Sequence, residues 1–435
     1  MNRALAAAVA ALLVLALPGV VLAGPGADPA GSEGSQPQVE GDAANTSVIP
    51  TEDLDLPERL VLGTNETESG EERVGTDVGT YLDGAAGDLE LRHGEHVFDE
   101  RMSEADTEAE ERAVIREEVS RLDDEVSSLR EREETVYEEY ADGEIGEREA
   151  VTELIRNHQR AVALEASIEE LESEAQLVPG IGIGEDLEIL HVQATTIQSP
   201  VREHVVAVHR GEAAGSVVHI EADETGVVLA AVDESEYLRE THRLDHRTLD
   251  ADEDEYALVS LGDGEQRLEE LYPRMLENAR LNVGDGQYQT ITGSVAHAGH
   301  SATIYLDQGT AEVYKEDQTL RLSATPTAVG ETESEDGYEL ELNRTYPGGP
   351  MKATLTDSAG EPVDGAEISV GGTPIGETED GERWFVAPHG SMTVVAAVDG
   401  NATVGDEPAD EARLSVSFEW EPEIEEELVP AAGSD

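Results

Sequence analysis

The feature that most constrains the fold is a heptad repeat of apolar residues in the second quarter of the chain. Its members follow one another in alternating steps of four and three residues: Ile115, Val119, Leu122, Val126, Leu129, Val136 and Tyr140. Glu133 is the one polar residue in this series. Such spacing lines one apolar stripe along a helix, and that stripe must be buried against another helix. We therefore expect a long helix with a coiled-coil seam.

A second helix is expected after a short break. The segment Asp142-Gly143-Glu144-Ile145-Gly146 carries turn residues that end the first helix. From residue 147 to residue 175, apolar side chains again share one helical face. Two apolar faces joined by so short a turn predict an N-terminal helical coiled-coil hairpin over residues 76–176. The same seam can instead recruit another copy of the chain, which would make a homo-oligomer.

Beyond Gly184 the hydrophobic period changes from helical to alternating, which indicates strands. The expected strands are residues 187–192, 205–209, 216–220, 226–232, 237–243, 256–261, 287–297, 302–306 and 310–315. One helix is expected over residues 266–279, with a break at Pro273. These elements predict a central α+β domain over residues 187–325, followed by a polar, acidic linker over 325–337.

Residues 338–420 predict an all-β, Ig-like sandwich, because short alternating segments are separated by Gly, Pro or Asp turns. The turn Asp357-Ser-Ala-Gly360-Glu-Pro362-Val-Asp-Gly-Ala366 is followed by Thr378-Glu-Asp-Gly381. These residues resemble the carboxypeptidase-regulatory-like and related bacterial Ig-like domains. The resemblance implies a β-sandwich with an accessory or adhesive role and no part in catalysis.

The N-terminus is typical of a secretory signal. Arg3 precedes an apolar run, Pro18-Gly19 breaks it, and small residues follow up to Ala23. We predict a signal peptide over residues 1–23, and a single uncleaved membrane anchor is the alternative. Residues 24–75 are rich in Gly, Pro, Ser and acidic residues, which predicts a disordered acidic linker. Its short apolar run 54–62 can dock on some other surface. Residues 421–435 form an acidic tail.

The charge of the chain excludes several classes of protein. It has 98 Asp and Glu against 27 Lys and Arg, a net charge of −71, and no Cys. Such a surface repels nucleic acid, and a chain without Cys has no disulfide, thiol nucleophile or Cys-ligated metal. Since the apolar periods persist, the acid indicates adaptation to multimolar salt, where screening acts within about 3 Å. An acidic, partly disordered protein is the alternative reading.

Two motifs add a resemblance. The first is Tyr-x-x-Gly-x-Ile-x-x-x-Glu, from Tyr140 to Glu149, and the second is the expected hairpin Tyr305-Leu-Asp-x-Gly-Thr310. With the signal peptide, they resemble uncharacterised exported haloarchaeal proteins, which implies export and no known activity. The hairpin also resembles PepSY domains, which are associated with extracellular peptidases. Ala311 departs from the Thr-Gly-x-Val ending of those domains.

Histidine pairs come closest to a metal site. His242 and His246 have the spacing of helical ligands, but they lie where an expected strand runs into a loop. His297 and His300 flank an expected turn, where the two rings can meet. No Gly-x-Ser-x-Gly elbow and no phosphate-binding loop occurs in the sequence. We therefore predict no catalytic residue, no cofactor site and no metal site.

Four Asn-x-Ser/Thr sequons, at Asn45, Asn65, Asn343 and Asn401, are compatible with a glycoprotein. We expect a non-enzymatic, secreted or cell-surface protein of a halophile. Its coiled-coil arm and Ig-like module would have a structural or interaction role, with a protein or a cell-envelope component as partner. The alternative is a regulator of an extracellular peptidase or envelope enzyme, acting through a PepSY-like domain.

Overall fold

The computed structural model describes residues 48–51, 56–63, 67–248, 256–277, 279–286, 289–297, 299–388, 390–399, 402–405, 407–409 and 412–419. All of these lie in one compact unit that begins at Thr46. The predicted signal peptide over residues 1–23 and the acidic tail over 421–435 lie outside the described residues. Within the described ranges, no helix is both long and apolar enough to cross a membrane.

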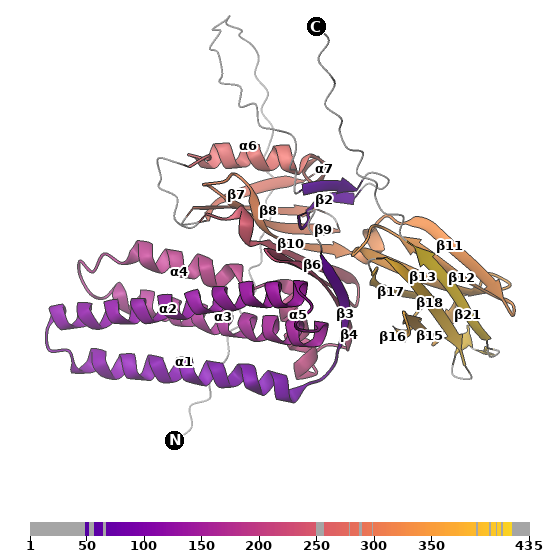
Figure 1. Cartoon of the computed structure of the whole chain (residues 1–435), viewed down its shortest axis with the longest axis horizontal. Coiled ribbons are helices and arrows are strands. Elements are labelled where there is room, and N and C mark those ends of the chain that lie inside the picture. Colours follow the sequence, from indigo (N-terminus) through magenta and orange to yellow (C-terminus); the bar gives the residue numbers. More distant parts are fainter. Residues whose placement is uncertain are drawn as a thin grey trace, which may run out of the picture. The chain divides into compact units, whose positions relative to one another are not determined.

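A layer of helices follows the first three strands of the described chain (Figure 1). Its members are α1 (Val78–Glu104), α2 (Glu108–Ala141), α3 (Glu147–Ala175), α4 (Gly184–Thr196) and α5 (Pro200–Arg210). The helices α2 and α3 pack against each other across the turn at 142–146, as the sequence predicted. The α2 seam from Ile115 to Leu129, however, shares one apolar cluster with Leu91 of α1 and Leu190 of α4, whereas Val136 and Tyr140 pack with the sheet. A helical layer therefore takes the place of the two-helix coiled coil predicted over residues 76–176.

Two expected strands are helices in the structure. Residues 187–192 lie in α4, and residues 205–209 lie in α5. The side chains of Val201, Val205 and Val208 are all buried in α5, and a short apolar run cannot distinguish a buried helix from a buried strand. The Ser199 side chain accepts a hydrogen bond from the backbone of the first turn, and Pro200 begins the helix. This capped start is a helix signal that outweighs the alternation.

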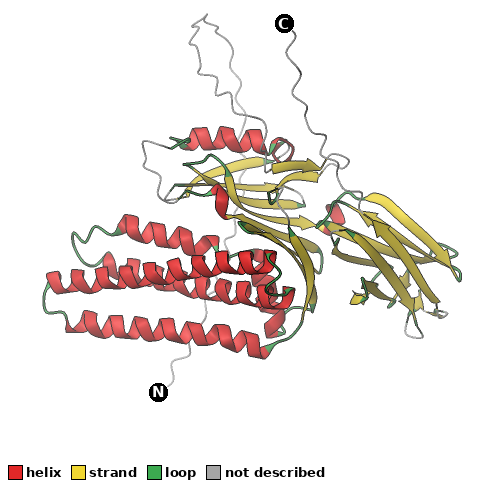
Figure 2. Cartoon of the chain, viewed as in Figure 1, coloured by secondary structure: helices red, strands yellow, loops and turns green. Residues whose placement is uncertain are grey.

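An eight-stranded antiparallel sheet forms the centre, in the order β3-β4-β5-β6-β10-β9-β8-β7 (Figures 1 and 2). The strands are β3 (Glu68–Val74), β4 (Ser216–Asp223), β5 (Gly226–Asp233), β6 (Glu236–Arg243), β7 (Arg280–Gly286), β8 (Thr290–His297), β9 (His300–Asp307) and β10 (Val313–Arg321). Since β3 precedes the helical layer and pairs with β4 after it, the helices are inserted between two neighbouring strands. The predicted domain start at residue 187 is therefore wrong, because the sheet resumes at Ser216.

Smaller elements pack on β7 to β10. They are α6 (Leu261–Leu271), α7 (Pro273–Leu276) and the two-stranded sheet of β1 (Val48–Thr51) and β2 (Leu56–Leu60). Pro273 begins α7, which confirms the predicted break. Residues 256–260 lead into α6, so the strand expected over 256–261 is wrong. The strands β1, β2 and β3 fall within the predicted disordered linker 24–75, and Leu60 is fully buried, so that prediction is wrong for the described part.

The C-terminal part is a sandwich of two four-stranded sheets. One has β11 (Ala328–Glu335), β12 (Tyr338–Arg344), β13 (Pro350–Asp357) and β17 (Glu382–Val386); the other has β15 (Glu367–Val370), β16 (Thr373–Glu377), β18 (Ser391–Val398) and β21 (Ala412–Glu419). The short strands β14 (Val363–Asp364), β19 (Thr403–Val404) and β20 (Glu407–Pro408) form a third sheet. Leu340 and Leu355 of one sheet share a core with Ile368 and Val394 of the other. The sandwich begins at β11, inside the predicted linker 325–337, so that linker is mostly strand.

The turn motif of this sandwich is structural. The Asp357 carboxylate accepts hydrogen bonds from the backbone amides of Ala359 at 2.8 Å and Glu361 at 2.9 Å. The Thr378 hydroxyl donates to the Val363 carbonyl at 2.7 Å and accepts from the Ala366 amide at 3.0 Å. These residue types therefore close the turns of the module, as in other Asx-type turns.

Candidate functional site

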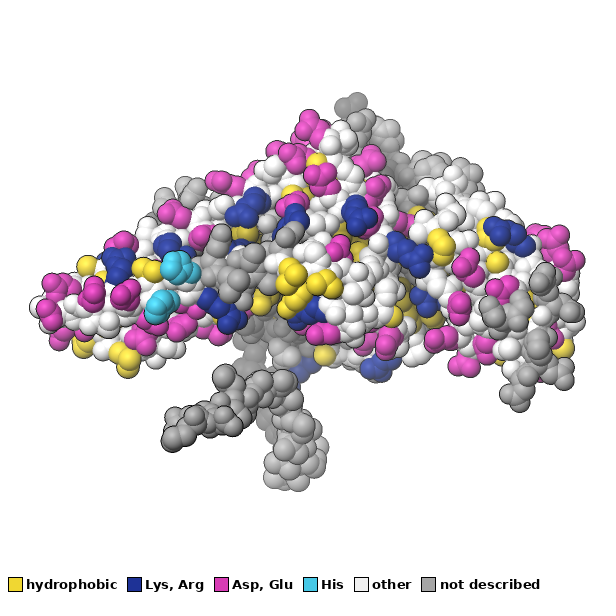
Figure 3. Space-filling model, turned by 90° about the horizontal axis from the view of Figure 1, so that it is seen from below, with side chains coloured by type: hydrophobic (Ala, Val, Ile, Leu, Met, Phe, Trp, Pro, Cys, Tyr) yellow, Lys and Arg dark blue, Asp and Glu magenta, His cyan; other side chains and the backbone are white. Residues whose placement is uncertain are grey.

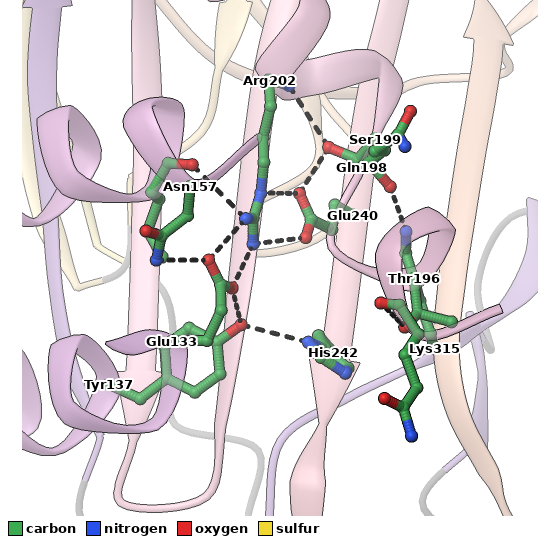
Figure 4. A network of polar contacts seen from close by, with 12 residues as sticks. Glu133, Tyr137, Asn157, Thr196, Gln198, Ser199, Arg202, Glu240, His242 and Lys315 are labelled. Carbon is green, nitrogen blue, oxygen red and sulfur yellow. Dashed lines mark hydrogen bonds and ion pairs between the residues drawn. The ribbon is translucent and has the colours of Figure 1, made fainter. Parts of the chain in front are cut away.

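Arg202 of α5 lies between two carboxylates in the interior, Glu133 of α2 and Glu240 of β6 (Figure 4). Its Nη1 and Nη2 atoms donate to the two oxygens of Glu133, each at 2.9 Å. Its Nε and Nη2 atoms donate to the two oxygens of Glu240 at 3.0 and 2.8 Å. The three side chains are at most 1% exposed. The guanidinium therefore makes two bidentate pairs out of contact with solvent.

Neutral groups complete the hydrogen bonding of both carboxylates. Glu133 accepts from the Tyr137 hydroxyl at 2.7 Å and from the Asn157 side chain at 3.0 Å. Glu240 accepts from the Ser199 hydroxyl at 2.5 Å. Buried charges are tolerated only when such partners replace the lost water. We call Glu133, Arg202 and Glu240, with these donors, the ion network.

A second cation lies beside the network. Lys315 of β10 donates to the Gln198 carbonyl and pairs with Asp317 at 3.2 Å. Burial alone would raise the pKa of Glu240, but the charges of Arg202 and Lys315 outweigh it and hold that pKa below its usual value. Burial raises the pKa of Asp317 to about 7, against the opposing charge of Lys315. Glu240 is thus held ionised, whereas Asp317 binds a proton far more readily than an exposed aspartate.

Local sequence explains how the network is positioned. Ser199 caps α5 by accepting the amide hydrogen of Arg202 at 3.2 Å, which fixes the first turn that carries the guanidinium. Glu133 occupies the heptad position between Leu129, which packs in the helical cluster, and Val136, which packs against the sheet. The polar exception in the seam therefore marks the point where α2 passes from helical neighbours to the sheet.

A separate ionic cluster lies on the opposite face of β6 and β10, the strands that carry Glu240 and Lys315. Successive side chains of a strand point to opposite faces of the sheet. The Glu316 carboxylate accepts from the Leu60 amide at 3.1 Å, the Tyr272 hydroxyl at 2.5 Å and the Gln318 side chain at 2.9 Å. Arg239 donates to the Leu60 carbonyl at 2.7 Å and lies 3.4 Å from Glu316. This cluster holds β2 on the sheet, which confirms the docking expected for the run 54–62 within its described part.

His242 and His246 do not converge. The Nδ1 atom of His242 lies 3.1 Å from the Tyr137 hydroxyl, on the side of the ion network. His246 lies in the 3-10 turn η1 (Leu244–His246), and its Nδ1 contacts the Val313 carbonyl at 2.7 Å. Across the described ranges, no group of three or more His, Asp or Glu side chains is arranged to hold a metal ion.

His297 and His300 do come together. They are cross-strand partners at the β8–β9 hairpin, and both line a concave site of about 230 Å³ with Arg274 and Glu277. Burial, and then the charge of His297, lowers the pKa of His300 to about 4. The turn therefore brings the two residues opposite each other, as expected, and His300 is held neutral at ordinary pH.

Asn343, the acceptor residue of one sequon, is buried and hydrogen-bonded within the sandwich. Asn343 is 7% exposed on β12, and its side-chain nitrogen donates to Glu341 at 2.6 Å. Attachment of a glycan to this nitrogen would break that contact and require space that the packed strand does not offer. The other sequons, at Asn45, Asn65 and Asn401, lie outside the described residues.

The sequence did not predict the ion network. It singled out only Glu133, as the one polar residue of the heptad series. Arg202 stood in a segment that was expected to precede a strand, and Glu240 stood among many carboxylates of an acidic chain. One sequence signal points to the surroundings of the network. Lys315, which lies beside it, is one of two lysines in the chain, and it ends the strand expected over residues 310–315.

The fold defines a multidomain protein with a helical N-terminal region, a central sheet and a C-terminal all-β sandwich. Three family models match successive parts of it. Residues 1–214 match a domain of unknown function (DUF7096), and residues 218–326 match a family of unknown function (DUF7094). Residues 329–405 match an archaeal fibronectin-III type-like domain, so the sandwich has an Ig-like fold. No curated protein and no solved structure matches the chain.

These matches refine the sequence-based resemblances. The Ig-like fold expected over residues 338–420 is confirmed, but the model that matches there is fibronectin-III-like, not carboxypeptidase-regulatory-like. The boundaries between the matched parts, after residues 214 and 326, agree with the starts of β4 and β11.

A buried histidine near the network gives a pH prediction. Burial, and then the charge of Arg202, lowers the pKa of His158 on α3 to about 3, against about 6.5 in an unfolded chain. The stability that this neutral ring contributes is present above pH 6.5 and is lost as the pH falls toward 3. We expect His158→Gln to reduce the slope of unfolding free energy against pH by about 1.4 kcal/mol per pH unit within that window.

Chemical denaturation in multimolar salt at pH 7, 6, 5 and 4 measures this slope. The matched control is His93→Gln, which removes an exposed histidine of α1. Equal slopes for His158→Gln and the unmodified chain would contradict the prediction.

Proposed function

We propose that this chain is a non-enzymatic, exported protein of a salt-rich environment, with a structural or interaction role at the cell surface. The observation that carries the proposal is the burial of the ion network. Glu133, Arg202 and Glu240 are bonded to one another, and each side chain is at most 1% exposed. Such a network joins the helical layer to the sheet, and its hydrogen-bonding groups are used within the fold. The fibronectin-III-like sandwich adds weak support, because this fold serves many functions.

The surface is consistent with high salt. Asp and Glu side chains are scattered over the face that Figure 3 shows and do not gather into one patch. A binding site for a cation or a basic partner would concentrate the charge, whereas a salt-adapted surface spreads it. The net charge of −71 is therefore better explained by the solvent than by a ligand.

Export is tested with the full chain carrying a C-terminal tag in a halophilic archaeal host. We expect added protease to remove the tag from intact cells, while a cytoplasmic marker protein survives. A tag that is protected in intact cells and released with the cytoplasm would refute export. A hydrolase activity that is lost in His297→Ala or His300→Ala would refute the non-enzymatic role.

The regulator of an extracellular peptidase or envelope enzyme is the second candidate. It is favoured by the PepSY-like hairpin Tyr305-Leu-Asp-x-Gly-Thr310, which lies at the turn between the paired strands β9 and β10. The tagged chain, recovered from culture medium in saturated salt, should then bring down a peptidase. Recovery without any peptidase counts against this candidate.

A further inference from the structure

A cleft of about 310 Å³ opens beside the ion network, between α2, the end of α4 and the segment after β6. Its lining includes Arg130 and Glu134 from α2, Leu244, His242 and Arg247. The volume is within the range of small-molecule sites, which combine apolar walls with a few polar groups. No family match and no part of the proposed function assigns a role to this cleft.

Arg247 has an incomplete set of hydrogen-bond partners among the described residues. Its guanidinium lies over the ring of Tyr314, 4.5 Å from the ring centre. Its Nε and Nη2 atoms are buried, and neither has a hydrogen-bond partner among the described residues. An ionised group whose donors are buried without acceptors is costly. The arrangement therefore calls for an acceptor from outside the described fold, and a carboxylate fits the fork of a guanidinium best.

His242 supplies a hydrogen-bond acceptor to the cleft, whereas Arg247 supplies donors. Burial, and then the charges of Lys315 and Arg202, holds the pKa of His242 well below its usual value, so its ring is neutral. The single hydroxyl hydrogen of Tyr137 is donated to Glu133. The 3.1 Å contact between Tyr137 and His242 Nδ1 therefore requires Nδ1–H to donate to the tyrosine oxygen (Figure 4). The other nitrogen, Nε2, is left as an acceptor for a donor group.

The charges around the cleft balance. Arg130 and Arg247 contribute two positive charges, while Glu131 and Glu134 contribute two negative charges at its exposed side. The two charges of Glu133 and Glu240 face those of Arg202 and Lys315. A phosphate dianion would face two carboxylates here, and a simple cation would face two guanidinium groups. A ligand that carries one charge of each sign meets neither repulsion.

We propose that this cleft binds a small zwitterion of the amino-acid class, with its carboxylate on Arg247 and its ammonium group toward His242 Nε2 and Glu134. The carboxylate accepts from the buried Nε and Nη2 atoms that lack partners. The ammonium group donates to the bare imidazole nitrogen and is attracted by the acidic rim. Leu244 provides an apolar wall for a short aliphatic side chain.

The test is calorimetric titration of the full chain in multimolar NaCl with glycine, L-alanine and L-leucine. Acetate and methylamine, each of which carries one of the two charged groups, are titrated in parallel. We expect saturable binding of at least one amino acid, and binding of acetate and methylamine at least tenfold weaker. Arg247→Leu should weaken amino-acid binding by about tenfold or more, because a charge-assisted pair is lost.

Arg132→Leu is the matched control, since Arg132 is exposed on α2, bonds the Ser128 carbonyl and does not line the cleft. It should bind as the unmodified chain does. Circular dichroism checks that each variant is folded. If Arg247→Leu does not fold, Glu134→Gln decides, because it should weaken amino-acid binding and leave acetate binding unchanged. Absence of amino-acid binding, acetate binding as tight as that of the amino acid, or unchanged affinity in these variants overturns the proposal.

Discussion

Replacing Arg202 by Met is expected to lower the free energy of unfolding by about 3–5 kcal/mol, because it leaves two buried carboxylates without their cation. Glu133 and Glu240 accept four hydrogen bonds from this guanidinium, and both are inaccessible to water. Methionine fills much of the volume of the arginine stem, so the loss reports on charge and not on a cavity. Denaturant unfolding in multimolar salt measures it.

A triple variant is expected to restore the stability lost in Arg202→Met. Arg202→Met combined with Glu133→Gln and Glu240→Gln removes both uncompensated charges, and we expect it to regain most of the lost stability. Arg148→Met, at an exposed arginine of α3 with a side chain 78% exposed, should leave the unfolding free energy almost unchanged. A loss below about 1 kcal/mol in Arg202→Met would show that the ion network does not hold the helices to the sheet.

Transfer of the chain from about 3 M to about 0.1 M NaCl is expected to unfold it, because the screening length rises from below about 3 Å to about 10 Å. Self-repulsion of a chain with net charge −71 then extends over neighbouring side chains. Circular dichroism against salt concentration locates the midpoint of this transition. A chain that keeps its helical signal at 0.1 M NaCl would rule out salt adaptation as the reason for the charge.

A charge variant separates screening from other effects of salt. Glu169, Glu170 and Glu172 lie on exposed positions in the last turns of α3, where the helix dipole already disfavours negative charge. Replacing all three by Gln is expected to move the transition to lower salt, with helix propensity nearly unchanged. An unchanged midpoint would mean that these carboxylates are not a source of the instability.

Long segments with a clear hydrophobic period were predicted well, whereas the boundaries between domains were not. The helix expected over residues 147–175 coincides with α3, and the sandwich strands appear where alternation indicated them. Helix α5 and strand β11 were misassigned. The first is a short apolar run that suits either period, and the second is an edge strand with mostly exposed, polar side chains. Hydrogen bonding to β12 makes β11 a strand, and that pairing leaves no hydrophobic pattern in the sequence.

For the candidate sites, contacts between residues close in sequence could be predicted, and contacts between distant residues could not. The meeting of His297 and His300 could be predicted because a hairpin turn brings them together locally. The contact of Arg202 with Glu133 joins residues 69 positions apart, and in so acidic a chain no single carboxylate stands out. The cleft beside His242 is formed by helices and a strand that meet only after the sheet has formed.

By itself, the sequence determined the helical seam, the alternating strands, the turn chemistry of the sandwich and the overall charge. These depend on the spacing of neighbouring residues or on simple sums over the chain. Only the tertiary structure decided that the helices are inserted between β3 and β4, that β2 docks on Glu316 and that Arg202 lies between two carboxylates. The physical reason is burial. An ionised group that is removed from water needs a counterion or hydrogen-bond partners at one defined place, and only the folded structure shows which of the many charged residues are buried together.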